Sequence, residues 1–139
     1  MAKIRHVAIF SKDTRMLADF YKTTFEMVEV ASQTPSEPGA EGRRAIYLSD
    51  GYINLAILPA REGMPEGIEH FGFQVDDVQA TGVTAKDAGA KYQLSPRPRD
   101  GRYAEFRIHD PVGTPVDLSA AGWATEPETA EQMAARVGR

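Results

Sequence analysis

Apolar and polar residues alternate in two short segments with closely similar sequences. Residues 4–9 read IRHVAI and residues 68–73 read IEHFGF. Alternation with a period of two is typical of a β-strand with one buried face. Similarity at a fixed offset along one chain indicates an internal repeat. The chain is therefore expected to consist of two related halves, each of which begins with a strand.

A helical pattern follows each of these strands after a polar break that contains Asp13 or Asp77. In the second half the pattern covers residues 78–88, is interrupted by Gly82 and is bounded by Gly89. Glycine is common just after the last turn of a helix. The pattern is stronger in the first half, where apolar residues recur at helical spacing: Leu17, Phe20, Tyr21 and Phe25.

Three further strand-like runs follow each predicted helix. Gly51 and Gly113 stand just before the last run of each half, where glycine permits the positive φ of a tight turn. Each half therefore is predicted to have the order βαβββ. The runs are residues 27–32, 43–49 and 52–58 in the first half, and residues 92–95, 102–108 and 114–119 in the second.

The two halves are expected to form one domain over residues 1–121. Module one covers residues 1–58 and module two covers residues 68–121, and the Pro- and Gly-rich residues 59–67 connect them. Residues 122–139 form a tail that contains helix formers and is expected to be helical. The polar loop 34–42 is expected to be a surface excursion, with a lid over a site as the alternative.

Composition narrows the classes of function. The 139 residues carry a net charge of −4, and the basic residues are scattered, which argues against a nucleic-acid partner. No apolar run reaches the roughly 20 residues of a membrane helix, and no signal peptide is evident, so a cytoplasmic location is expected. There are no cysteines, and a metal site must therefore use nitrogen and oxygen ligands.

Polar residues that could bind a metal or transfer protons fall on one face of the predicted strands. His6 and His70 occupy equivalent positions of the two repeats, so related strands would bring them together. In the run 102–108, Ala104, Phe106 and Ile108 form the apolar face. Strand alternation then places three residues on the opposite face: Tyr103, Glu105 and Arg107.

The leading-strand histidines and the closing segment DPVGTPVDL, residues 110–118, resemble the vicinal oxygen chelate superfamily. The superfamily includes glyoxalase I, extradiol dioxygenases, methylmalonyl-CoA epimerase and the fosfomycin and bleomycin resistance proteins. The resemblance covers residues 4–119 and implies an α+β fold in which two βαβββ modules curve a mixed sheet into a cup. It also implies one divalent metal, Fe(II) or Mn(II) in preference to Zn(II) or Ni(II), on His6, His70 and Asp117.

Three positions depart from the patterns of individual families. Asp117 stands where glutamate is commoner, and Leu55, flanked by Asn54, stands where glyoxalase I supplies a fourth ligand. Arg107 corresponds to a tyrosine of the extradiol dioxygenases. The sequence therefore does not match the complete site of either family.

The expected function is that of a metal-dependent enzyme, dioxygenase-like or lyase- and isomerase-like, acting on a small oxygen-chelating substrate. Arg107 is expected to hold a carboxylate or phosphate of a small organic acid, and Glu105 or Tyr103 to relay protons. Alternatively, Glu105 and Arg107 pair with each other in solvent. The competing class is a metal-free, drug-sequestering binding protein, and either is expected to be a homodimer. No sequence pattern assigns a partner to Trp123, although this residue could close a pocket.

Overall fold

The computed structural model describes residues 1–31, 44–93, 95–96, 104, 106–127, 129–131 and 134. Tyr103, Glu105 and the loop 34–42 lie outside these residues, as does much of the tail predicted to be helical. The predictions made for these parts of the chain stay predictions. In the described part of the chain, no helix is long and apolar enough to cross a membrane.

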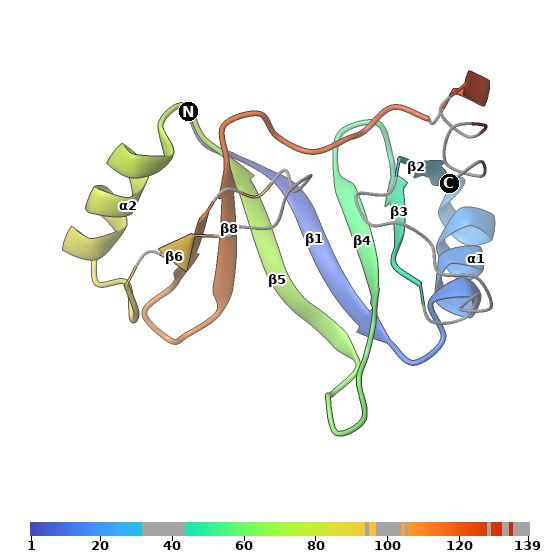
Figure 1. Cartoon of the computed structure of the whole chain (residues 1–139), viewed down its shortest axis with the longest axis horizontal. Coiled ribbons are helices and arrows are strands. Elements are labelled where there is room, and N and C mark those ends of the chain that lie inside the picture. The colour runs from blue at the N-terminus through green and yellow to red at the C-terminus, as the bar shows by residue number, and fades with distance from the viewer. Residues whose placement is uncertain are drawn as a thin grey trace. The chain divides into compact units, whose positions relative to one another are not determined.

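The described elements follow the order βαβββ twice (Figure 1). The first set is β1 (Lys3–Ser11), α1 (Thr14–Phe25), β2 (Val28–Val30), β3 (Ile46–Ser49) and β4 (Asn54–Pro59). The second set is β5 (Gly67–Gln74), α2 (Val78–Asp87), β6 (Ser95–Pro96), β7 (Phe106–His109) and β8 (Pro115–Ser119).

Eight strands form one mixed sheet in the order β2-β3-β4-β1-β5-β8-β7-β6. Read from one edge, the first repeat has the order β2-β3-β4-β1, and read from the other edge, the second has the equivalent order β6-β7-β8-β5. This symmetry confirms the predicted pair of βαβββ modules and the α+β class. The pairing of β5 with β8 is parallel, whereas the pairings β2-β3, β3-β4, β6-β7 and β7-β8 are antiparallel. The predicted strand 52–58 starts at Asn54 instead, because the N–H groups of Tyr52 and Ile53 donate to the Asp50 carboxylate in the turn.

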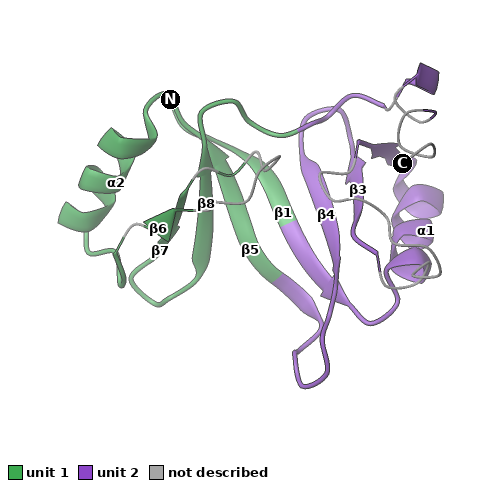
Figure 2. Cartoon of the chain, viewed as in Figure 1, with its two compact units in different colours: residues 1–7, 69–123 green, residues 8–68, 124–139 purple. Residues whose placement is uncertain are grey.

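The chain divides into two compact units (Figure 2). Unit 1 contains residues 1–7 and 69–123, and unit 2 contains residues 8–68 and 124–139. The start of β1 and most of β5 belong to unit 1. This unit therefore contains part of the first strand of each repeat. The histidines of both repeats, the closing segment and Trp123 are therefore all parts of unit 1.

Unit 1 buries one side of its strands against α2. Val75 and Val78 pack with Val116 and Leu118, and Phe73, Phe106 and Ile108 surround this cluster. These residues alternate along β5, β7 and β8 with His70, Arg107 and Asp117, as the predicted two-sided pattern requires. The polar residues therefore share the face of the strands that is turned away from this core.

Unit 2 has a second core, in which Ala8, Val30, Tyr47 and Ala56 pack together. Helix α1 contacts β3 and β4 and buries Thr14 and Ala18. Two of the apolar residues that predicted this helix are mainly exposed: Phe20 has 53% of its surface accessible and Phe25 has 61%. They contact Tyr21 and each other as an aromatic cluster on the helix surface. The periodicity thus predicted the helix, although small residues form its buried face.

The same residue type begins both helices. The Asp13 side chain accepts a hydrogen bond from the N–H of Met16, and that of Asp77 accepts one from the N–H of Ala80, each at 3.0 Å. Each bond satisfies a backbone donor that has no partner within the helix. The polar breaks recognised in the sequence are therefore helix N-caps.

Replacing Asp77 with alanine is expected to lower the free energy of unfolding by about 1 kcal/mol, because the N–H of Ala80 loses its acceptor. Urea unfolding at neutral pH measures the loss. Asp76→Ala is the matched control, since the Asp76 side chain is 96% exposed and lies 3.7 Å from the terminal amine. Equal effects of the two substitutions would contradict the capping role.

The hairpin turn before β4 makes stability depend on pH. Hydrogen bonds from the backbone N–H of Ile53 and Tyr52 hold the pKa of Asp50 below its ordinary value. A lowered folded-state pKa stabilises the fold above the unfolded-state pKa, and this contribution is lost as the pH falls through the folded-state value. Asp50→Asn keeps an acceptor oxygen but not the charge. The variant is expected to lose less stability than the wild type between about pH 6 and about pH 2.5 in urea titrations; an unchanged slope would contradict this account.

Candidate metal centre

Three neighbouring strands each contribute one polar side chain to a buried cluster in unit 1. His6 on β1, His70 on β5 and Asp117 on β8 are 4%, 6% and 3% exposed. The parallel register pairs Gly72 with Asp117, and strand alternation puts His70 on the same face two residues earlier. The repeat similarity and the closing segment therefore led to three side chains that do converge.

The potential ligand atoms face one another at distances that suit a metal ion. His6 Nε2 lies 3.2 Å from His70 Nε2, and His70 Nε2 lies 3.3 Å from Asp117 Oδ2. Two ligands that are each about 2.1 Å from a metal lie about 3.0 Å apart at a right angle and about 3.4 Å apart at the tetrahedral angle. One potential ligand atom from each of the three residues lies within 4.8 Å of the others.

Glu69 orients the ring of His70. Its carboxylate accepts a hydrogen bond from His70 Nδ1, which leaves the lone pair of Nε2 directed at His6 and Asp117. This hydrogen bond, with the nearby charges of His70 and Arg107, holds the pKa of Glu69 below its ordinary value, against opposing effects of burial and of Asp117. A carboxylate on the second ring nitrogen is a common support for a metal-binding histidine.

Arg107 balances the negative charge of the cluster. Antiparallel register places it directly opposite Asp117, and Arg107 Nε donates to Asp117 Oδ1 over 2.6 Å. Arg107 Nη1 lies 3.8 Å from Glu69, and Nη2 contacts His70 Nδ1 at 3.3 Å. The guanidinium uses one oxygen of Asp117 and leaves Oδ2 on the side of His70. The structure thus brings Arg107 to the predicted metal ligands.

Trp123 covers the other histidine. Its indole stacks on the ring of His6, with centroids 4.8 Å apart and planes 6° from parallel. Trp123 is 8% exposed, so it belongs to the packed interior of unit 1.

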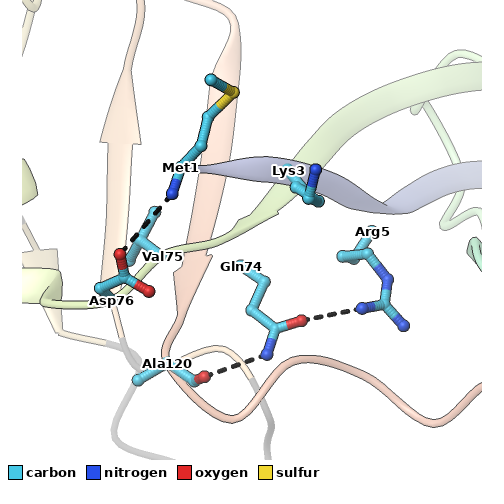
Figure 3. Close-up of a pocket in the computed structure, with 7 residues that line it drawn as sticks. All are labelled: Met1, Lys3, Arg5, Gln74, Val75, Asp76 and Ala120. Carbon is cyan, nitrogen blue, oxygen red and sulfur yellow. Dashed lines mark hydrogen bonds and ion pairs between the residues drawn. The ribbon is translucent and has the colours of Figure 1, made fainter.

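Unit 1 also contains an open cavity of about 410 Å³ at the start of β1 (Figure 3). Arg5 Nη1 donates to Gln74 Oε1, and Gln74 Nε2 donates to the carbonyl of Ala120. The cavity is lined by Met1, Lys3, Arg5, Gln74, Val75, Asp76 and Ala120. None of the three potential metal ligands lines this cavity.

Sequence reasoning missed Glu69 and the role of Trp123. Strand alternation assigns Glu69 to the face opposite His70, yet its long side chain brings the carboxylate to the edge of the neighbouring ring. Trp123 follows the last strand, where no periodic pattern indicates its direction. A carboxylate beside a predicted ligand histidine was the available signal for Glu69.

Comparison with known proteins places these features in a family. The family model described as Glyoxalase/Bleomycin resistance protein/Dioxygenase superfamily matches residues 3–118. Among curated proteins, none matches the sequence.

Solved structures resemble the chain in fold at low sequence identity. A hypothetical protein from Bacillus halodurans C-125 is 19% identical with a TM-score of 0.65, over 90% of this chain and 98% of that one. Streptomyces coelicolor methylmalonyl-CoA epimerase is 24% identical with a TM-score of 0.58, over 88% of this chain and 97% of the epimerase. A 2,3-dioxygenase from Pseudomonas sp. KL28 is 17% identical with a TM-score of 0.62, over 93% of this chain and 44% of the dioxygenase.

The family match covers most of the chain, including both leading strands and the three residues of the cluster. These similar structures share the fold and differ in their stated activities. The chain belongs to the Glyoxalase/Bleomycin resistance protein/Dioxygenase superfamily.

Proposed function

We propose that this protein is an enzyme that holds one divalent metal on His6, His70 and Asp117 and acts on a small substrate with two adjacent oxygen atoms. The convergence of two imidazole nitrogens and one carboxylate oxygen is the observation that carries the proposal. Two histidines and one carboxylate leave coordination positions open for substrate oxygens and water. Fe(II) and Mn(II) suit this ligand set best, with Zn(II) and Ni(II) as alternatives.

The charges of the cluster favour an anionic substrate. Glu69 and Asp117 are negative and Arg107 is positive, so a doubly charged cation would leave the cluster with one net positive charge. Buried charges interact strongly because little water screens them. A small organic acid, or a substrate that develops an oxyanion, would supply the compensating charge.

The residues of the candidate site have distinct roles in this proposal. A bound divalent cation supplies a Lewis acid that stabilises developing negative charge on substrate oxygen. Arg107 fixes the Asp117 carboxylate and offers further N–H donors to a substrate oxygen. Glu105 or Tyr103, both outside the described residues, is proposed to relay protons.

Lyase or isomerase chemistry and dioxygenase chemistry are both compatible with this ligand set. The similar structures include a methylmalonyl-CoA epimerase and a 2,3-dioxygenase, and identities below 25% carry the fold alone. Oxygen uptake and solvent deuterium incorporation, measured on small organic acids, separate the two classes of reaction. The homodimer and the cytoplasmic location expected from the sequence are part of the same proposal.

A metal-free binding protein is the second candidate. The short Arg107–Asp117 pair favours it, because a guanidinium already neutralises the carboxylate without a metal. His70 lies between Glu69 and Asp117 and contacts both carboxylates. Metal content distinguishes the two candidates directly.

The protein, purified without an affinity tag or chelator and reconstituted with Fe(II), Mn(II) or Zn(II), is expected to contain about one metal ion per chain. His6→Ala, His70→Ala and Asp117→Ala are each expected to lose it, because each removes one of three protein ligands. Inductively coupled plasma mass spectrometry measures the content.

His109→Ala is the matched control for this experiment, since His109 is the third histidine of the sequence and is not part of the cluster. It is expected to retain the wild-type metal content. A wild-type protein that stays free of metal after reconstitution would reject the metalloenzyme and favour the binding protein.

Arg107→Gln is expected to lower the free energy of unfolding of the metal-free protein by about 3 kcal/mol, because it leaves the buried Asp117 carboxylate without its guanidinium partner. Chemical denaturation in the presence of a chelator measures the change. In the Asp117→Asn background the same substitution is expected to cost much less.

Arg15→Gln controls for loss of an arginine side chain, since Arg15 keeps 31% of its side chain accessible and lies 3.7 Å from both Asp19 and Glu29. Its effect is expected to stay within about 0.5 kcal/mol. If Arg107→Gln were as mild as this control, the Asp117–Arg107 pair would not be the charge balance of the site.

A further inference from the structure

The flat contact between Trp123 and His6 restricts the orientation of one predicted metal ligand. An imidazole turns about its Cβ–Cγ bond unless neighbouring groups prevent it. An indole plane 6° from the ring of His6 leaves little room for such a turn, and both side chains are buried. The stack therefore keeps the ring edge that carries Nε2 directed at His70, where the two nitrogens are 3.2 Å apart.

Gly72 makes room for this stack. A Cβ at position 72 would lie 2.6 Å from Trp123 Cη2, 2.7 Å from Trp123 Cζ2 and 2.8 Å from His6 Cβ. Side chains do not approach this closely, so any other residue would displace the indole or the histidine. Gly72 also pairs in register with Asp117. Only a glycine at this point of β5 lets Trp123 and His6 meet over the strand that carries His70.

The segment after β8 holds Trp123 in this place. The N–H of Gly122 donates to Ser119 Oγ over 2.9 Å, and Gln74 Nε2 donates to the carbonyl of Ala120. Gly122 has a φ of +81°, and a Cβ there would lie 2.8 Å from Gln74 Oε1. These contacts tie the turn between Asp117 and Trp123 to β5. The strand that supplies the carboxylate ligand thus continues into the residue that covers His6.

We propose that Trp123, seated on Gly72, is the positioning residue that fixes His6 for metal binding. The inference rests on the metal site of the proposed function. Glu69 accepts a hydrogen bond from the second ring nitrogen of His70, and Trp123 stacks on the ring face of His6. Ordering a ligand before the metal arrives lowers the entropy lost on binding and so raises affinity.

Co(II) affinity, measured by equilibrium dialysis on the full chain, tests this role. Trp123→Leu removes the flat ring, and Gly72→Ala pushes it off His6. Each is expected to weaken Co(II) binding about tenfold, the lower end of the effect of losing a group that orients a ligand. Trp123→Phe keeps an aromatic face and is expected to stay within about threefold of the wild type. The visible absorption bands of bound Co(II) should broaden in the first two variants and not in the third.

Tyr92→Leu is the matched control, because Tyr92 contacts the ring of His109 at the same centroid distance of 4.8 Å, outside the cluster. It is expected to leave Co(II) affinity unchanged. Wild-type affinity in both Trp123→Leu and Gly72→Ala, while His6→Ala abolishes binding, would overturn the positioning role and leave the metal site intact. A wild type that binds no Co(II) would overturn the metal site and this inference together.

A readout on the wild type covers the case in which a variant does not fold. Trp123 is the only tryptophan of the sequence, so its fluorescence reports on this stack alone. Co(II) is expected to quench the emission with the same midpoint as the dialysis isotherm. Fluorescence emission that bound Co(II) leaves unchanged would overturn the inference.

Discussion

Three strands of unit 1 bring buried nitrogen and oxygen atoms close together. His6, His70 and Asp117 direct two ring nitrogens and one carboxylate oxygen at one another, away from bulk water. Such an arrangement is unfavourable unless a proton or a cation lies between the lone pairs. Two neighbouring residues reduce this cost: Arg107 neutralises Asp117, and Glu69 fixes the tautomer of His70.

The constraint also links the fold to the function. A parallel β5-β8 pairing beside the antiparallel β7-β8 pairing puts Gly72 and Arg107 on either side of Asp117. The repeat places the two histidines on the leading strands, where their ring nitrogens and one carboxylate oxygen come together as potential metal ligands. The similar structures share this fold and differ in their stated activities, so the fold alone does not define a reaction.

Much of the fold could be predicted from the sequence, because period-two alternation, the repeat and the two capping aspartates are local signals. The same alternation separated His70 and Arg107 from the apolar core residues, whereas Asp117 was identified through the family resemblance of the closing segment. Glu69 was missed because alternation describes where a side chain leaves the strand and not where a long side chain ends. The Trp123 stack depends on a glycine, a turn and a cross-strand contact that are distant in sequence. The exposed face of α1 was unexpected because helical periodicity does not say which apolar residues meet the sheet.

Extended X-ray absorption fine structure of the Zn(II)-loaded protein tests the central claim most directly. The account predicts a first shell of nitrogen and oxygen at about 2.0 to 2.1 Å with the outer-shell scattering of two imidazoles. His6→Ala and His70→Ala should each remove one imidazole from that pattern. Zn(II) without imidazole scattering, or scattering unchanged in both variants, would show that the metal binds elsewhere and would contradict the account.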